Sequence, residues 1–214
     1  MKFAAFAVFS LVALTASRAD ILVNGDFHDG AAHWRGEAHD AGASDHVDIA
    51  SLTHGGGSAG AVINLGARAW WPHMYQTFNS QYTSFTYSLT FSVSQDYAPK
   101  QRSSDWVQST TSNPFLSYVL GGLYKGDLAP PKGNDFLLVV FDKEAALFSD
   151  VTITPKVGTT DTQTVTGTLS HVPAHDEKVL SIVFNHGTGS VTFYNVALTA
   201  LPDEKKDTNA VAQP

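Results

Sequence analysis

The segment Tyr82–Ser94 constrains the fold of this chain more than any other part of the sequence. Apolar and hydroxyl-bearing residues alternate along it, and the apolar set is Phe85, Tyr87, Leu89, Phe91 and Val93. Successive side chains of a β-strand point to opposite faces, so a period of two gives one apolar face and one polar face. We therefore predict a half-buried antiparallel strand whose apolar face covers a core.

Other strand patterns follow along the chain, with turn residues between them. Phe136–Phe141 (FLLVVF) is apolar throughout, which predicts a strand buried on both faces. In Trp70–Phe78, Pro72 favours an edge position or the start of the strand, because proline has no N–H to donate. Further strands are predicted at 47–52, 61–65, 145–148, 151–154, 162–169, 179–184 and 190–201. This spacing of short strands is typical of a sandwich or barrel.

The two ends of the chain differ in character from the part between them. Of 214 residues, 1–19 are predicted to be a secretory signal peptide, with Lys2 before an apolar run and Ser17-Arg18-Ala19 as the cleavage site. We therefore expect a secreted or periplasmic protein whose mature chain starts at Asp20 and has no membrane span. Residues 202–214 are charged and lack apolar periodicity, so a disordered tail is expected there.

Charge and cysteine content exclude some classes of partner. The formal net charge is −7, and loss of the positive Lys2 and Arg18 with the signal peptide changes it to −9. An acidic exported protein is a poor partner for nucleic acid, and for acidic polysaccharides unless its basic residues cluster. No cysteine is present, so stability has to come from a packed core and not from disulfides.

The mature chain opens on a short apolar run followed by two turns. We predict a strand at Ile21–Val23 and turns at Asn24–Asp26 and Asp29–Gly30, because glycine tolerates positive φ and Asn or Asp side chains bond the nearby backbone. Phe27 and Trp34 are predicted to lie in the core.

Three patterns then occur in the order that a known family shares. They are N-G-x-F at Asn24–Phe27, aromatic-x-Q-x-apolar at Tyr75–Phe78 before the alternating strand, and a closing strand at Val191–Leu198. In this the chain resembles the galactose-binding-like jelly rolls, especially the carbohydrate-binding modules of the CenC type. The resemblance implies one all-β domain over 20–201, a two-sheet antiparallel β-sandwich of jelly-roll type, and sugar binding. Residues 97–134 have no counterpart in the family pattern and are interpreted as an insertion.

The resemblance also implies a structural calcium ion, but this chain departs from the family at two positions. The family's Glu after the N-terminal Phe is His28 here, and the first Asp of its closing motif is Asn195. Calcium affinity depends on the number of charged oxygen ligands. We therefore expect no cofactor, and a neutral His28–Asn195 contact in place of the ion. Asp26, Asp29 and Asp48 leave a calcium site open as the alternative.

Candidate sugar contacts follow from the chemistry of the ligand. Sugar rings present apolar C–H faces that aromatic rings cover, while amide and charged side chains bond the hydroxyls. The stacking candidates are Trp71, Tyr97, Trp106 and Tyr124, and the polar candidates are Arg68, Gln76 and Gln95. Polar residues flank Trp106 on both sides, which favours its exposure, whereas core packing is the competing interpretation for the aromatic residues within strands.

The sequence thus predicts a secreted, non-catalytic, lectin-like module whose partner is a polysaccharide or glycan. One alternative is a structural or adhesive extracellular protein that uses the same fold to bind protein. The other is a polysaccharide-degrading enzyme, which requires two carboxylates facing one glycosidic bond. Asp142 and Glu144 share one strand face, but they more simply mark the point where a strand leaves the core. The nine histidines fix no four-ligand arrangement for zinc, and the G-x-S-x-G pattern of a serine hydrolase is absent.

Overall fold

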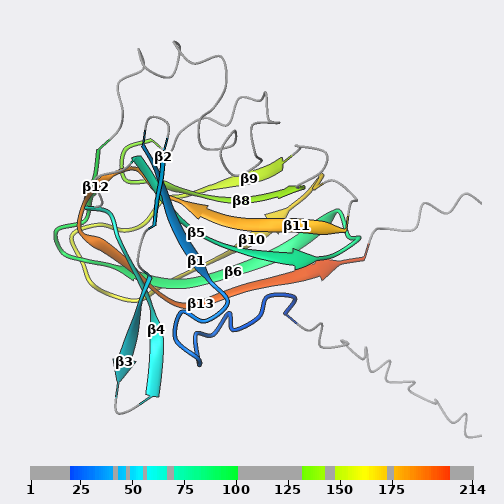
Figure 1. Cartoon of the computed structure of the whole chain (residues 1–214), viewed down its shortest axis with the longest axis horizontal. Helices are drawn as coiled ribbons and strands as arrows, with labels where there is room; N and C mark the ends of the chain where they lie inside the picture. Colours follow the sequence, from blue (N-terminus) through cyan, green and yellow to red (C-terminus); the bar gives the residue numbers. More distant parts are fainter. Residues whose placement is uncertain are drawn as a thin grey trace, which may run out of the picture.

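A computed structural model gives the fold of the chain (Figure 1). It describes residues 20–40, 43–46, 49–54, 57–66, 70–100, 132–142, 148–172 and 176–202. Within these ranges the regular elements are all strands, every pairing is antiparallel, and no helix is long and apolar enough to cross a bilayer. The predicted signal peptide, most of the predicted insertion and nearly all of the predicted tail lie outside the described residues.

Two large sheets make up the fold. Sheet A has the order β2-β1-β5-β11-β8-β9, with bounds Ala43–His46, Arg35–Asp40, Trp70–Asn79, Glu177–Val183, Phe136–Asp142 and Phe148–Ile153. Sheet B has the order β10-β6-β13-β4-β3, with bounds Gln163–Leu169, Ser84–Val93, Ser190–Leu201, Gly57–Asn64 and Ile49–His54. A small ribbon pairs β12 (Gly187–Thr188) with β7 (Ala98–Pro99). The predicted two-sheet antiparallel β-sandwich is confirmed.

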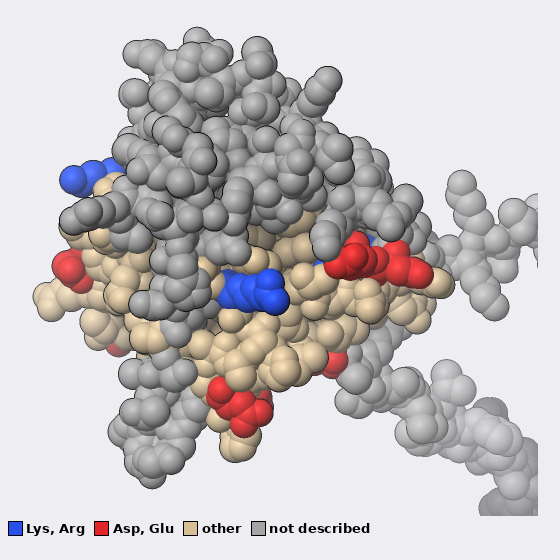
Figure 2. Space-filling view, in the orientation of Figure 1, with Lys and Arg blue, Asp and Glu red and all other residues tan. Residues whose placement is uncertain are grey.

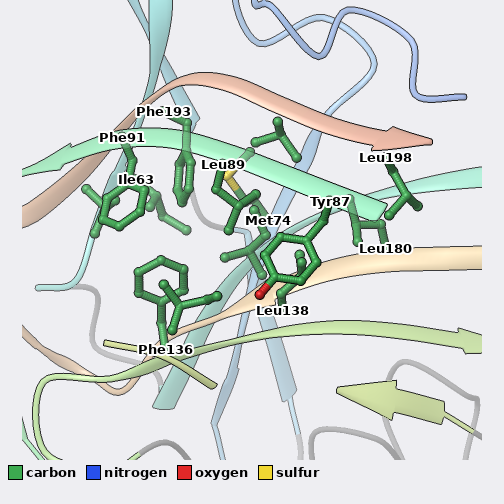
Figure 3. Packing of buried hydrophobic residues seen from close by; sticks show 14 of the residues in the cluster. Ile63, Met74, Tyr87, Leu89, Phe91, Phe136, Leu138, Leu180, Phe193 and Leu198 are labelled. Atoms are coloured by element: carbon green, nitrogen blue, oxygen red, sulfur yellow. The ribbon is translucent and has the colours of Figure 1, made fainter. Parts of the chain in front are cut away.

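The core lies between the two sheets, and the alternating strand β6 supplies much of its sheet B side. All five apolar residues predicted for this strand are buried. Figure 3 shows Phe91, Leu89 and Phe193 of sheet B facing Phe136 and Leu138 of sheet A. The rings of Phe91 and Phe136 meet edge to face with centroids 5.2 Å apart. Each such side chain contributes about 1.5–3 kcal/mol through burial, so β6 positions the two sheets against each other.

Strand β8 is buried on both faces, as its unbroken apolar sequence predicted. Phe136, Leu138 and Val140 belong to the core cluster, and the residues between them on the opposite face are also buried.

Pro72 shows how an interior strand accommodates proline. The edge position considered for it is wrong, because β5 lies between β1 and β11. Pro72 is the third residue of the strand, and the register between β1 and β5 shifts beside it, between the pairs Glu37↔His73 and His39↔Trp70. A missing N–H costs least at such an irregularity. The alternative of a strand start is thus close to what the structure shows.

Residues 20–34, here called the hook, differ from the prediction in one respect. Ile21–Val23 form no strand. The hook runs along the part of β13 that extends beyond its pairing with β4. There the Ile21 N–H donates to the Leu198 carbonyl at 3.0 Å and the Gly25 carbonyl accepts the Val196 N–H at 2.8 Å (Figure 1). Regular pairing stops there, because the next N–H on β13, that of Leu198, donates to the Asp20 carboxylate at 3.0 Å.

The other predictions for the hook are confirmed. Both predicted turns are present, and Phe27 and Trp34 are buried with ring centroids 5.5 Å apart. Gly25 has to be glycine, because a Cβ there would come within 2.2 Å of the Val196 carbonyl oxygen. The hook therefore bridges sheet A and sheet B, and its residues Leu22, Phe27 and Trp34 belong to the core cluster.

Candidate functional site

A groove of about 640 Å³ lies where the hook meets sheet A. Its lining comes from four segments: Val23, His33 and Trp34 of the hook, Arg35 of β1, Tyr75, Gln76 and Thr77 of β5, and Glu177 of β11. In β5, Tyr75 and Thr77 alternate with the buried Met74, Gln76 and Phe78. The side chains of Tyr75 and Thr77 therefore point away from the core and into the groove.

Strand register brings the polar groups of the groove together. Arg35 lies directly opposite Tyr75 in the β1–β5 pair, and directly opposite residues have Cβ atoms about 4.5–5.5 Å apart. Thr77 pairs with Val179, two residues after Glu177 on the same face of β11. Arg35 and Thr77 are exposed, and Tyr75 and Glu177 are half-buried.

The Tyr75 ring is supported from one side. The imidazole of the fully buried His73, two residues earlier on the same strand face, stacks on it with centroids 5.7 Å apart and an interplanar angle of 28°. A ring held in this way offers a rigid apolar surface at small entropic cost. Arg35 adds a fork of N–H donors, Glu177 adds acceptors, and Thr77 supplies both. Figure 2 shows few charged groups among the described residues on this side of the molecule, with uncharged surface between them.

The hook wall of the groove is folded around Asn24. This residue has a left-handed backbone (φ +54°), and its side chain donates to the carbonyls of Gly30 at 2.9 Å and Ala32 at 2.8 Å. Its own carbonyl accepts the indole N–H of Trp34 at 3.1 Å. His33, with φ +70°, is held between these contacts and is exposed at the groove.

The predicted site residues fall in different places. Gln76 lines the groove, but it is only 5% exposed and its amide bonds the backbone of Val23. Gln95 is exposed in the turn after β6. Trp71 is on β5, and its side chain is outside the described part, as are Arg68, Trp106 and Tyr124 altogether. Of Gln76 and Gln95, whose side chains are described, only Gln76 lines the groove. Their roles in ligand binding stay predictions.

Tyr97, the fourth stacking candidate, is in the core cluster. It is 6% exposed, and its hydroxyl donates to the Asn134 carbonyl at 3.0 Å. Burial raises the pKa of this phenol well above its usual value, and the nearby Asp135 carboxylate adds to the rise. The ring of Tyr97 packs in the core and its hydroxyl is hydrogen-bonded to Asn134. Its role in stacking on a sugar also stays a prediction.

Sequence reasoning missed His33, Arg35, Tyr75, Thr77 and Glu177 as site residues. A usable signal existed for one of them, since a period of two places Thr77 on the same face as Tyr75 and Gln76 on the opposite face. No such signal existed for Arg35 and Glu177. They come from strands 142 positions apart in numbering, and only the sheet order brings them near β5.

A second hollow, of about 360 Å³, lies on the outer face of sheet B. The outward residues there are Thr164, Thr166 and Thr168 of β10, Thr86, Ser88 and Thr90 of β6, and Asn195, Ala197 and Thr199 of β13. We call this set the hydroxyl face. Its members pair in rows across the three strands, and none of them is charged or aromatic. It therefore lacks the combination of ring and charged groups found in the groove.

The residues of the predicted calcium region are also placed. His28 is exposed, and its backbone N–H donates to the Asp26 carboxylate at 3.2 Å. Asn195 is half-buried at the register shift of β13, and Asp48 is outside the described residues. Among the described residues, no three His, Asp or Glu side chains come together as a metal site. The expected absence of a cofactor stays a prediction.

Comparisons with known proteins extend the description of the fold. No protein-family model and no curated protein sequence matches this chain. Among solved structures, the enzymatically active domain of bacteriophage CBA120 tailspike protein 4 is similar with a TM-score of 0.51 and 10% identity, over 85% of this chain and 21% of that chain. The chain thus spans about a fifth of the length of that protein.

Other similar structures are mostly carbohydrate-binding modules. A family 11 module from Clostridium thermocellum, in complex with a β-1,3-1,4-mixed-linked tetrasaccharide, has a TM-score of 0.49 at 9% identity, over 85% of this chain and 95% of that one. TmCBM61, in complex with β-1,4-galactotriose, has a TM-score of 0.48 at 12% identity, over 86% and 99%. At such low identity and TM-score, these two likenesses imply no shared ligand or function.

Proposed function

We propose that this chain is a carbohydrate-binding module that binds a polysaccharide in the groove beside the hook. One observation supports this most directly. The ring of Tyr75 lies half-exposed in an open groove, and Arg35, Thr77 and Glu177 line the same groove. Sugar recognition uses the same two components, an aromatic surface for the C–H face of the ring and hydrogen-bonding groups for its hydroxyls.

The charge in the groove favours a neutral polysaccharide. Its described lining carries one arginine and one glutamate, so their formal charges cancel. An acidic sugar needs an excess of cationic groups, which this lining lacks. The volume lies in the range of about 300–1,000 Å³ that is usual for ligand sites.

Affinity electrophoresis and calorimetry against a panel of neutral β-glucans, galactans, xylans and mannans test the proposal. We expect the protein to bind at least one of them, and Tyr75→Ala to weaken that binding at least tenfold through loss of the stacking surface. Tyr82→Ala is the matched control, because Tyr82 is 45% exposed and does not line the groove. Equal binding by Tyr75→Ala and the wild type would refute the groove as the site.

The two alternatives predict different results in the same panel. If no polysaccharide retards the protein, the structural or adhesive function that binds protein partners replaces the proposal. Release of reducing ends or unsaturated products would favour the enzyme. A glycosidase needs two carboxyl groups facing one bond, and the described lining of the groove supplies Glu177 alone.

We also propose that the protein is exported and that nucleic acid is not a partner. Both proposals rest on the sequence, namely on the signal-like residues 1–19 and the net charge of −7. N-terminal sequencing of the protein from the culture medium or periplasm should give a chain that starts at Asp20. An intact Met1 would refute export by this signal.

A further inference from the structure

A buried amide connects the hook to sheet A at the floor of the groove. Gln76 points inward from β5, and its Oε1 accepts the Val23 N–H at 2.7 Å. Its Nε2 donates to the Val23 carbonyl at 2.8 Å and to the His33 carbonyl at 3.4 Å. One side chain therefore binds both backbone groups of Val23, near the start of the hook, and the carbonyl of His33, near its end.

The segment that Gln76 holds has a conformation that needs support. Three hook residues other than glycine, Asn24, Phe27 and His33, have positive φ angles of 54–70°. Such residues cost free energy and persist only where surrounding contacts hold them. Asn24 supplies those contacts within the hook, while Asp20, Ile21 and Gly25 bind the hook to sheet B. Gln76 supplies the contacts between the hook and sheet A.

The contact with Gln76 determines where the wall of the groove lies. Val23 is 54% exposed and lines the groove, although its N–H and carbonyl are both bonded to a buried side chain. Val23 and His33 are the hook residues whose backbone this amide bonds, and both line the groove.

We propose that Gln76 is a positioning residue, which fixes the Val23–His33 wall at the distance from Tyr75 that a sugar requires. This inference rests on the proposed function of the groove. Gln76 acts through the backbone of the hook, since its acceptor and its donors are taken by Val23 and His33. It differs in this from the direct ligand contact that the sequence suggested.

Gln76→Glu tests the proposal through pH. At neutral pH the carboxylate has no donor, and it faces the carbonyl oxygens of Val23 and His33. We expect the Val23 amide to lose its protection from hydrogen exchange and the affinity for the polysaccharide to fall at least tenfold. A protonated carboxyl group has one acceptor and one donor. Below the carboxyl pKa the variant should therefore recover affinity, relative to the wild type measured at each pH.

Gln163→Glu is a matched control. Gln163 makes the same type of bridge, since its Oε1 accepts the Lys156 N–H at 2.7 Å and its Nε2 donates to the Lys156 carbonyl at 2.9 Å. It lies on β10 and does not line the groove. We expect loss of protection at Lys156 with unchanged affinity. Gln76→Met, which keeps the side-chain length without polar groups, should lose affinity at every pH with no recovery in acid.

The outcomes separate the positioning role from the proposed function. Loss of Val23 protection in Gln76→Glu with unchanged affinity would overturn the positioning role and leave the module intact. If the wild type binds no polysaccharide, the proposed function fails. Hydrogen exchange at Val23 and the fluorescence of Trp34 then still decide whether Gln76 holds the wall. If Gln76→Glu does not fold at neutral pH, Gln76→Met still allows the loss of Val23 protection to be compared with the loss of affinity.

Discussion

The outer faces of the two sheets both arise from strand alternation, but they carry different kinds of side chain. Both consist of outward residues from strands whose other face covers the core. The hydroxyl face of sheet B is built from strands alone, and its described outward residues on β10, β6 and β13 are uncharged. The groove on sheet A combines three strands with the hook, and it brings an aromatic ring and two opposite charges together. Strand alternation alone makes the polar face of sheet B, whereas the groove on sheet A also has the hook as a wall.

The largest effect should come from removing the charged group of Arg35 in the groove, and removal of a hydroxyl from the hydroxyl face is the comparison. Arg35→Ala should weaken polysaccharide binding about tenfold to a hundredfold, because a hydrogen bond to a charged group contributes about 1.5–3 kcal/mol. Thr166→Ala on the hydroxyl face should leave binding unchanged. Isothermal titration calorimetry measures both. The reverse pattern would place the ligand on sheet B and end the distinction between the faces.

A smaller effect is expected when a side chain is added behind the hydroxyl face, on the core side of β10. A Cβ at Gly167 would lie 2.5 Å from the hydroxyl oxygen of the buried Tyr87, so Gly167→Ala has to displace that ring. We expect a loss of about 1–3 kcal/mol in the free energy of unfolding, measured by denaturant titration, with sugar affinity unchanged.

Gly66→Ala is the control for this substitution. The nearest atom to its Cβ would be 3.9 Å away, and stability should change by less than about 0.5–1 kcal/mol. Loss of affinity in Gly167→Ala would show that the two faces are coupled through the core.

The smallest effect concerns Tyr97, the stacking candidate found in the core. Burial raises the pKa of its phenol, so the unfolded chain ionises near pH 10 while the folded protein keeps the neutral form. The unfolded state then binds fewer protons than the folded state, and stability falls as pH rises above about 10. Tyr97→Phe should cost about 0.5–1.5 kcal/mol at pH 8 through the lost bond to Asn134, and this deficit should shrink at higher pH.

Thermal unfolding at pH 8 and near pH 11 measures this difference. Polysaccharide affinity at pH 8 should stay unchanged in Tyr97→Phe. A deficit that grows with pH would contradict the burial of the phenol.

The sequence predicted the regular parts of the fold because periodicity is local. Alternation in β6 and the apolar run of β8 gave their burial pattern directly. The strand predicted at Ile21–Val23 failed because its polar backbone groups are satisfied in another way. The Asp20 carboxylate and the Gln76 amide take N–H and carbonyl groups that a sheet ladder would use. Such contacts between residues far apart leave no periodic pattern.

The site was less accessible to prediction for the same reason. Trp, Tyr and Gln were selected by residue type, and type does not tell on which side of a sheet a side chain lies. Gln76 points inward, so its amide meets the hook, and Tyr97 is covered by the core. Arg35 and Glu177 are ordinary charged residues in the sequence, and they become part of a site only through the order β1-β5-β11.

The bond between Asp20 and Leu198 joins residues 178 positions apart. Contacts of such long range close large loops, and chains rich in them fold slowly. The hook cannot settle against β13 before that strand, the last of the described strands, has been synthesised and paired. We therefore expect the hook wall of the groove to assemble late in folding, and a nascent or truncated chain that lacks β13 to expose the apolar side chains of the hook.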